Sequence, residues 1–108
     1  MSDVFELDHL LAKKLHTGKS YLEFLRVPAI SSGIYVLPAG AVDPQKPHTE
    51  DEIYYVISGK ANIRIDSEIR SVAEGSVIFV EAGADHRFFD IEQELVLLVV
   101  FGPAESNP

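Results

Sequence analysis

The sequence predicts an all-β protein, a sandwich or barrel of short strands with one short helix before it. From residue 21 onward the chain consists of short runs rich in Val, Ile, Tyr and Phe, residue types that favour strands. Glycine and proline separate these runs at regular intervals, which is typical of the turns in small all-β domains. Because the chain has 108 residues, we expect a single domain.

A short amphipathic helix is predicted near the N-terminus. Its apolar stripe has helical spacing and consists of Leu7, Leu10, Leu11 and Leu15. Gly18 follows as a stop signal, since glycine commonly ends helices. We therefore expect residues 1–20 to form an N-terminal arm outside the barrel.

Strand-forming runs fill the rest of the chain, and we expect the barrel to span residues 21–102. The runs are 21–27, 32–37, 53–57, 61–65, 69–73, 77–80, 86–89 and 95–101. In the run 61–65 apolar and polar residues alternate, so that strand should have one face in water. A hairpin turn is predicted at 66–68, and residues 103–108 are expected to be a frayed tail.

Charge and composition exclude several classes of function. The net charge is −8, whereas proteins that bind nucleic acid or anionic membranes need a positive surface. The longest apolar run, 95–101, is far too short to span a membrane, and the acidic N-terminus does not resemble a signal peptide. The chain has no cysteine and hence no disulfide framework. We expect a cytoplasmic protein with no nucleic-acid or membrane partner.

Three side chains are candidate metal ligands: His48, Glu52 and His86. Two imidazoles and one carboxylate can hold a divalent metal on one face and leave other positions open. On one straight strand His48 and Glu52 would lie about 13 Å apart, at ~3.3 Å per residue, which is too far to share an ion. Either the two residues are unrelated, or the chain bends sharply at 49–51.

The spacing around these residues resembles the two characteristic motifs of the cupin family. The first motif, G-x5-H-x-H-x3-E-x6-G, is matched by Gly40, Lys46, His48, Glu52 and Gly59. The second, G-x5-P-x-G-x2-H-x3-N, is matched by Gly75, Glu81, Gly83, His86 and Asp90. The motifs occur in the family's order and cover about a third of the chain.

The resemblance implies a cupin-type jelly-roll barrel whose mouth binds a divalent metal such as Fe, Zn, Ni or Mn. The family's ligands carry over to His48, Glu52 and His86, and small cupins commonly form homodimers. Lys46 stands where the first motif has a histidine, and an ammonium has no lone pair to donate to a metal. Glu81 and Asp90 replace a proline and an asparagine, changes that the site should tolerate.

The wall of a substrate pocket has four candidates: Lys46, Tyr54, Tyr35 and Phe88. Tyr54 should face the barrel interior because it alternates with Glu52, although a core aromatic is the simpler interpretation. Lys46 would share a face with His48 on a regular strand and could bind an anionic substrate. We favour a solvent-exposed lysine instead, since exposure is the usual state of that residue.

Gln45 offers an amide oxygen as a possible fourth ligand, an interpretation that the sequence does not favour.

The function that the sequence supports best is a metal-binding cupin that acts on or binds a small molecule, with an oxygenase or an isomerase among the possibilities. The missing histidine of the first motif leaves an alternative open, namely a non-catalytic or metal-free module that binds a small molecule or has a regulatory role. A scaffold or storage role is a third interpretation. The sequence specifies neither the metal nor the substrate, since the same ligands accept several ions and one fold hosts many reactions.

Overall fold

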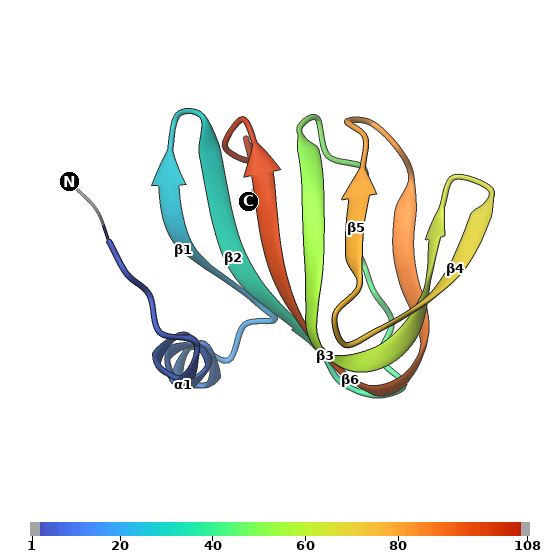
Figure 1. Ribbon diagram of the computed structural model, residues 1–108, viewed down its shortest axis with the longest axis horizontal. Coiled ribbons are helices and arrows are strands. Elements are labelled where there is room, and N and C mark those ends of the chain that lie inside the picture. The colour runs from blue at the N-terminus through green and yellow to red at the C-terminus, as the bar shows by residue number, and fades with distance from the viewer. Residues whose placement is uncertain (1–2, 107–108) are drawn as a thin grey trace.

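The computed structural model describes residues 3–106, which form one helix and six strands (Figure 1). The elements are α1 (Leu7–Thr17), β1 (Tyr21–Val27), β2 (Ile30–Leu37), β3 (Asp51–Ile65), β4 (Glu68–Ala73), β5 (Val77–Val80) and β6 (His86–Gly102). All strand pairs are antiparallel, as the predicted all-β jelly-roll requires. No helix within this part of the chain is both long enough and apolar enough to cross a membrane.

The strands follow the order β1-β2-β6-β3-β4, and β5 pairs with β3 beside β4. Two long strands, β3 and β6, pair along nearly their whole lengths, and the sheet curls around them into a trough (Figure 1). The first half of β3 pairs with the second half of β6 on one side of the trough. The remaining halves pair on the other side, where β4 extends the sheet. The two long strands thus join both walls of the barrel.

The long strands correct part of the sequence-based prediction. Residues 53–57 and 61–65 were expected to be separate strands but form β3, and 86–89 and 95–101 both belong to β6. Gly59 bends β3 at φ 105° without ending it, and the β3–β6 register shifts around this position. A Cβ atom at residue 59 would collide with the Glu94 carbonyl, so only glycine allows the two strands to approach here.

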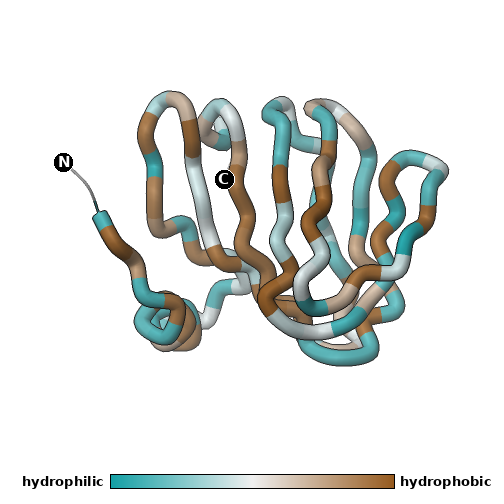
Figure 2. Tube along the Cα trace, viewed as in Figure 1, coloured by the Kyte–Doolittle hydropathy of each residue, from teal (hydrophilic) through white to brown (hydrophobic). Residues whose placement is uncertain are grey.

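The main core lies inside the trough and is built from the inward residues of each strand. Tyr54, Val56 and Phe88 are fully buried there, and aromatic and aliphatic side chains from the other strands surround them. Hydrophobic and hydrophilic residues alternate along much of the chain trace, as expected for strands with one buried face (Figure 2). The predicted turn at 66–68 is confirmed, with Asp66 at φ 51°.

Helix α1 packs on the outside of the barrel over β1 and β2. Its leucines Leu7, Leu10 and Leu11 contact a second apolar cluster built around Ile34 and Val36 on the outer face of β2. Gly18 ends the helix in the left-handed conformation, as predicted. Leu15, which completes the stripe in the sequence, is 78% exposed and does not belong to this cluster.

The expectation of a frayed C-terminal tail is wrong for residues 103–106, while 107–108 lie outside the described residues. The backbone N–H of Glu105 donates a hydrogen bond to Ser31 Oγ at 2.8 Å, and Arg26 donates to the Glu105 carbonyl at 2.7 Å. Ser106 Oγ donates to Glu50 Oε2 at 2.8 Å. These bonds hold the segment across the rim of the barrel and place Glu105 in its mouth.

Candidate metal centre

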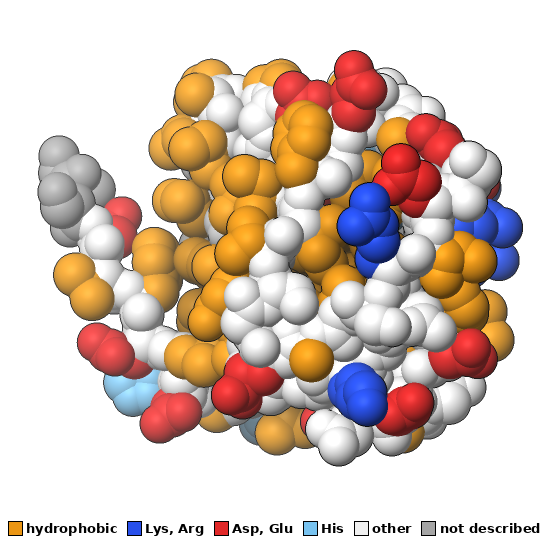
Figure 3. Space-filling model, turned by 45° about the vertical axis from the view of Figure 1, so that its right-hand side comes forward, with side chains coloured by type: hydrophobic (Ala, Val, Ile, Leu, Met, Phe, Trp, Pro, Cys, Tyr) orange, Lys and Arg blue, Asp and Glu red, His pale blue; other side chains and the backbone are white. Residues whose placement is uncertain are grey.

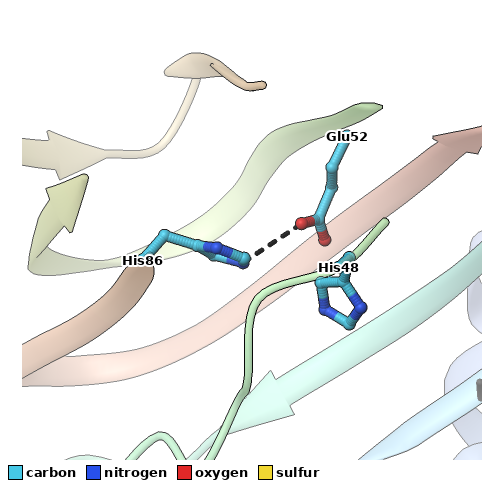
Figure 4. Close-up of side chains that lie close together, drawn as sticks. All are labelled: His48, Glu52 and His86. Carbon is cyan, nitrogen blue, oxygen red and sulfur yellow. Dashed lines mark ion pairs between the residues drawn. The ribbon is translucent and has the colours of Figure 1, made fainter. Parts of the chain in front are cut away.

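The three predicted ligands converge at the barrel mouth (Figure 4). His48 lies in the loop before β3, Glu52 is the second residue of β3, and His86 is the first residue of β6. One ligand atom from each lies within 4.8 Å of the other two. The chain therefore bends at 49–51, and the two residues that a straight strand would separate do meet.

Contacts between two loops explain the convergence. The loop 38–50 contains three prolines and forms neither helix nor strand, so it can fold over the barrel edge. The backbone N–H of Gly83 donates to the His48 carbonyl at 2.7 Å, and the N–H of Ala82 donates to Asp51 Oδ1 at 2.9 Å. These bonds tie the loop that carries His48 to the turn that precedes His86.

His86 presents its Nε2 atom to the centre. Its Nδ1 lies 3.0 Å from the carbonyl oxygen of Ala84, which can only accept, so Nδ1 carries the proton in the neutral ring. Nε2 lies 3.1 Å from Glu52 Oε1 and 3.1 Å from the Tyr54 hydroxyl. Burial alone would lower the pKa of His86, but the Glu52 carboxylate and the Ala84 carbonyl outweigh burial and raise that pKa above its ordinary value.

His48 is oriented by a carboxylate from the C-terminal segment. Its Nδ1 lies 3.1 Å from Glu105 Oε2, and Glu105 is 5% exposed. A carboxylate behind one ring nitrogen fixes the tautomer of a metal-binding histidine and makes the other nitrogen a better donor. The ring packs edge-on against Phe101 at a centroid distance of 4.9 Å, which holds its plane.

Glu52 shows that the residues fit a cation. Its side chain is 1% exposed, and neither of its carboxylate oxygens has a hydrogen-bond donor among the described residues. The 3.1 Å approach of His86 Nε2 is close enough for an ion pair but is not directed as a hydrogen bond. A buried carboxylate without donors is costly, and a divalent ion bound between this carboxylate and the two imidazoles would remove that cost.

Asp43 supports the centre from behind and is completely buried. Its Oδ1 accepts hydrogen bonds from the Tyr35 hydroxyl at 2.9 Å and from the backbone of Gln45 at 3.2 Å. Its Oδ2 accepts from Gln45 Nε2 at 2.9 Å and from the backbone of Phe88 at 3.0 Å. This single carboxylate thereby joins the loop 38–50 to β2 and β6.

A cavity of about 220 Å³ opens directly beside the candidate ligands. It is lined by Tyr21, Tyr35, Gln45, His48, Glu52, Val99, Phe101 and Glu105. Its size suits a small metabolite, since pockets for drug-sized ligands range upward from ~300 Å³.

The four predicted pocket residues lie in different places. Tyr35 lines the cavity, whereas Tyr54 lies behind it against His86. Phe88 is fully buried and packs edge-on against Tyr54 at a centroid distance of 5.0 Å. Lys46 is exposed on the outer surface of the loop, in the orientation that the sequence favours.

Tyr21, Asp43 and Glu105 belong to the site but were missed from the sequence. The Tyr21 ring lies over Gly33, where a Cβ atom would collide with it, so a glycine diagonal to an aromatic residue on the neighbouring strand was the available signal. That signal can be read only once the pairing of β1 with β2 is known. Asp43 and Glu105 lie in proline-containing segments without strand periodicity, and nothing in their local sequence indicates burial.

The three tyrosines near the cavity are neutral hydrogen-bond donors. Burial is the largest cause that raises the pKa of each hydroxyl, and neighbouring carboxylates raise it further. Tyr35 and Tyr54 donate to Asp43 and Gln45, respectively. The Tyr21 hydroxyl is buried and has no partner among the described residues, which leaves its donor available to a bound molecule.

Glu105 gives the metal-free protein a specific pH dependence. Burial, followed by the charges of Glu52 and Glu50, raises the pKa of Glu105 from 4.5 to about 7. The folded state therefore holds this proton more tightly than the unfolded state does. The resulting stabilisation is complete below pH 4.5 and is lost as the pH rises through about 7.

We expect Glu105→Gln to remove this component. Urea unfolding of the metal-free protein at a series of pH values measures this. Between pH 5 and 8 the free energy of unfolding should fall less in the variant than in wild type, because its slope against pH is set by the difference in bound protons between the folded and unfolded states. The amide oxygen of Gln can still accept the hydrogen bond from His48 Nδ1. Parallel curves for the two proteins across this range would contradict the assignment.

Comparison with known proteins identifies the family of this chain. The chain matches the cupin domain family over residues 33–101. It is 48% identical over 102 residues to an uncharacterized protein of Streptomyces coelicolor, and the alignment covers 94% of this chain and 97% of that protein. The chain therefore belongs to the cupin family.

Solved structures share the fold at low sequence identity. TT1209 from Thermus thermophilus superposes with a TM-score of 0.74 and 24% identity, over 95% of this chain and 99% of that one. The DMSP lyase DddQ of Ruegeria pomeroyi superposes with a TM-score of 0.69 and 18% identity, over 77% of this chain and 47% of the lyase. These likenesses support the jelly-roll fold.

Proposed function

We propose that this protein is a metal-binding cupin that acts on a small molecule at the barrel mouth. His48, Glu52 and His86 would hold one divalent ion, and the cavity beside them would receive the substrate. The observation that carries this proposal is the buried carboxylate of Glu52, which lacks hydrogen-bond donors among the described residues and lies beside two imidazoles that are each oriented by a second group.

The ion would supply a Lewis acid next to the cavity, and a redox-active ion would also permit oxygen chemistry. The protein would orient the substrate and shield part of it from water. Tyr21 would donate its unpartnered hydroxyl hydrogen bond to the substrate, while Val99 and Phe101 would exclude water from one wall. No Lys or Arg occurs among the described residues that line the cavity, so we propose a neutral substrate rich in oxygen acceptors rather than a multiply charged anion.

Metal content tests the proposal first. We expect protein purified without a histidine tag or chelator to contain one ion of a first-row metal per chain, and the chelated protein to bind Co²⁺ with the same stoichiometry. Oxygen consumption by the iron-loaded protein with candidate substrates would then separate oxygenase chemistry from other reactions. A chain that binds no first-row ion at neutral pH would refute the metal function.

One observation favours a second candidate, a metal-free binding module. Protonated His86 can pair with Glu52, since the two side chains are each 1% exposed and their nearest atoms lie 3.1 Å apart. That pair would satisfy the carboxylate without an ion and leave the cavity to a small ligand. The metal titration separates the two functions, because only the first requires an ion at stoichiometric occupancy.

We also propose that the chain forms a homodimer through the outer face of β3 and β5. Ile53 pairs with Phe79 and Tyr55 pairs with Val77 across these strands, and all four are 41–68% exposed. Figure 3 shows hydrophobic side chains gathered on one side of the surface, among more acidic than basic residues. Two copies that repel through a net charge of −8 need such an uncharged face to associate.

Light scattering should show that the wild-type protein is a dimer and that Phe79→Lys is a monomer. A wild-type monomer would contradict the proposal.

A further inference from the structure

A fourth oxygen points at the candidate metal position. We infer that Gln45 binds the ion through its amide oxygen Oε1 and so replaces the histidine that the first cupin motif has at position 46. This inference rests on the proposed metal site and makes it a four-ligand site. The sequence alone did not favour this role for Gln45, but the contacts of its amide group support it.

The orientation of the Gln45 amide is fixed by its neighbours. Its Nε2 donates to Asp43 Oδ2 at 2.9 Å, and its Oε1 accepts from the Tyr54 hydroxyl at 2.9 Å. Rotating the amide by half a turn would bring Oε1 against the Asp43 carboxylate, and two acceptors would then face each other in a buried place. Oε1 is therefore held toward the interior of the barrel mouth.

Oε1 also faces the lone pair of a candidate ligand. It lies 3.3 Å from His48 Nε2. When Glu105 is ionised its carboxylate can only accept, so His48 Nδ1 carries the proton of the neutral ring and Nε2 is unprotonated. Two lone pairs at this distance repel each other unless a cation lies between them. Adjacent ligands that each bind one ion at ~2.1 Å are themselves separated by ~3.0–3.5 Å, a range that includes the observed distance.

Lys46 cannot take this place. Its side chain is exposed and lines an outer cavity that His48 also lines, but neither Glu52 nor His86 is among the described residues that line it. The loop thus turns residue 45 inward and residue 46 outward. Gln45 extends the ligand set by one neutral oxygen without adding charge. An amide oxygen is a harder donor than imidazole, so the exchange moves the preference of the site toward oxygen-seeking ions such as Mn²⁺.

Gln45→Leu tests this inference because it keeps a side chain of similar size and removes the amide. The probe is Co²⁺, titrated into chelated protein and followed by its visible absorption. We expect the affinity of the variant for Co²⁺ to fall by about 10-fold or more, since even groups that only support a ligand change affinity 10- to 100-fold. The absorption bands should also shift as the number of ligands changes. Lys46→Ala is the matched control and should change neither the affinity for Co²⁺ nor the absorption bands.

A measurement on the wild-type chain covers the case in which Gln45→Leu does not fold. The sequence contains two glutamines, Gln45 and Gln93, and Gln93 is exposed on β6. In ¹⁵N NMR spectra one equivalent of Zn²⁺ should shift the side-chain amide signal of Gln45 and leave that of Gln93 in place.

The outcomes separate this inference from the proposed function. If wild-type protein binds Co²⁺ and Gln45→Leu binds it with equal affinity and the same spectrum, Gln45 is not a ligand and the metal site stands with three. An unmoved Gln45 amide signal in Zn²⁺-saturated protein would overturn the inference in the same way. If wild-type protein binds neither ion, the metal function itself fails.

Discussion

Replacing His86 with alanine is expected to abolish metal binding at stoichiometric concentration while the barrel still folds. The substitution removes one of the two imidazoles that would bind the ion. Loss of a merely supporting residue costs about 10- to 100-fold in affinity, so loss of a ligand should exceed that range. Inductively coupled plasma analysis and Co²⁺ titration of the variant measure the effect.

The fold should survive this change because His86 begins a long strand that pairs with β3 along nearly its whole length. The Tyr54 hydroxyl keeps its hydrogen bond to Gln45 in the variant. We expect the free energy of unfolding to fall by about 1–3 kcal/mol, the usual cost of an unsatisfied buried polar group. His9→Ala is the matched control, since His9 is exposed on α1 and far from the site in the sequence. Wild-type metal content in His86→Ala would exclude His86 as a ligand.

Replacing Asp43 with alanine should have the largest effect on stability among the residues around the site. Asp43 is 0% exposed and accepts four hydrogen bonds, two at each oxygen. Alanine leaves buried donors on Tyr35 and Phe88 without partners, and each such donor costs about 1–3 kcal/mol. We expect a total loss of about 3–5 kcal/mol in the urea unfolding of metal-free protein, together with weaker Co²⁺ binding.

Asparagine should not rescue Asp43, although it has nearly the same shape. All four partners are donors, so the side-chain NH₂ of asparagine would face two of them. Asp90→Asn is the control, since Asp90 is exposed at φ 48° and asparagine tolerates that conformation. A stability of Asp43→Asn equal to that of wild type would show that the hydrogen-bond network does not depend on the carboxylate.

The fold was predictable because its signals are local. The run at 21–27 and the run at 77–80 coincide with β1 and β5, since strand-forming residues and flanking turn residues fix their ends. The long strands were not predictable as single elements. In the sequence Gly59 indicates the end of a strand. In the barrel it only bends β3, because β3 pairs with β6 on both sides of this residue.

The candidate metal ligands were predictable because motif spacing indicates them, whereas the residues that support them were not. His48, Glu52 and His86 follow from the offsets of the glycines around them. Glu105 reaches His48 only because the chain after β6 turns back over the barrel rim. Asp43 is charged and follows no strand pattern, so only the tertiary structure reveals that it is buried.

Anomalous diffraction from crystals soaked with Co²⁺ would locate the bound ion. We expect one strong peak per chain at the barrel mouth, within ~2.0–2.3 Å of His48 Nε2, His86 Nε2 and a Glu52 oxygen. A peak bound elsewhere on the chain, or a mouth that holds no ion at saturating Co²⁺, would contradict the proposed metal site.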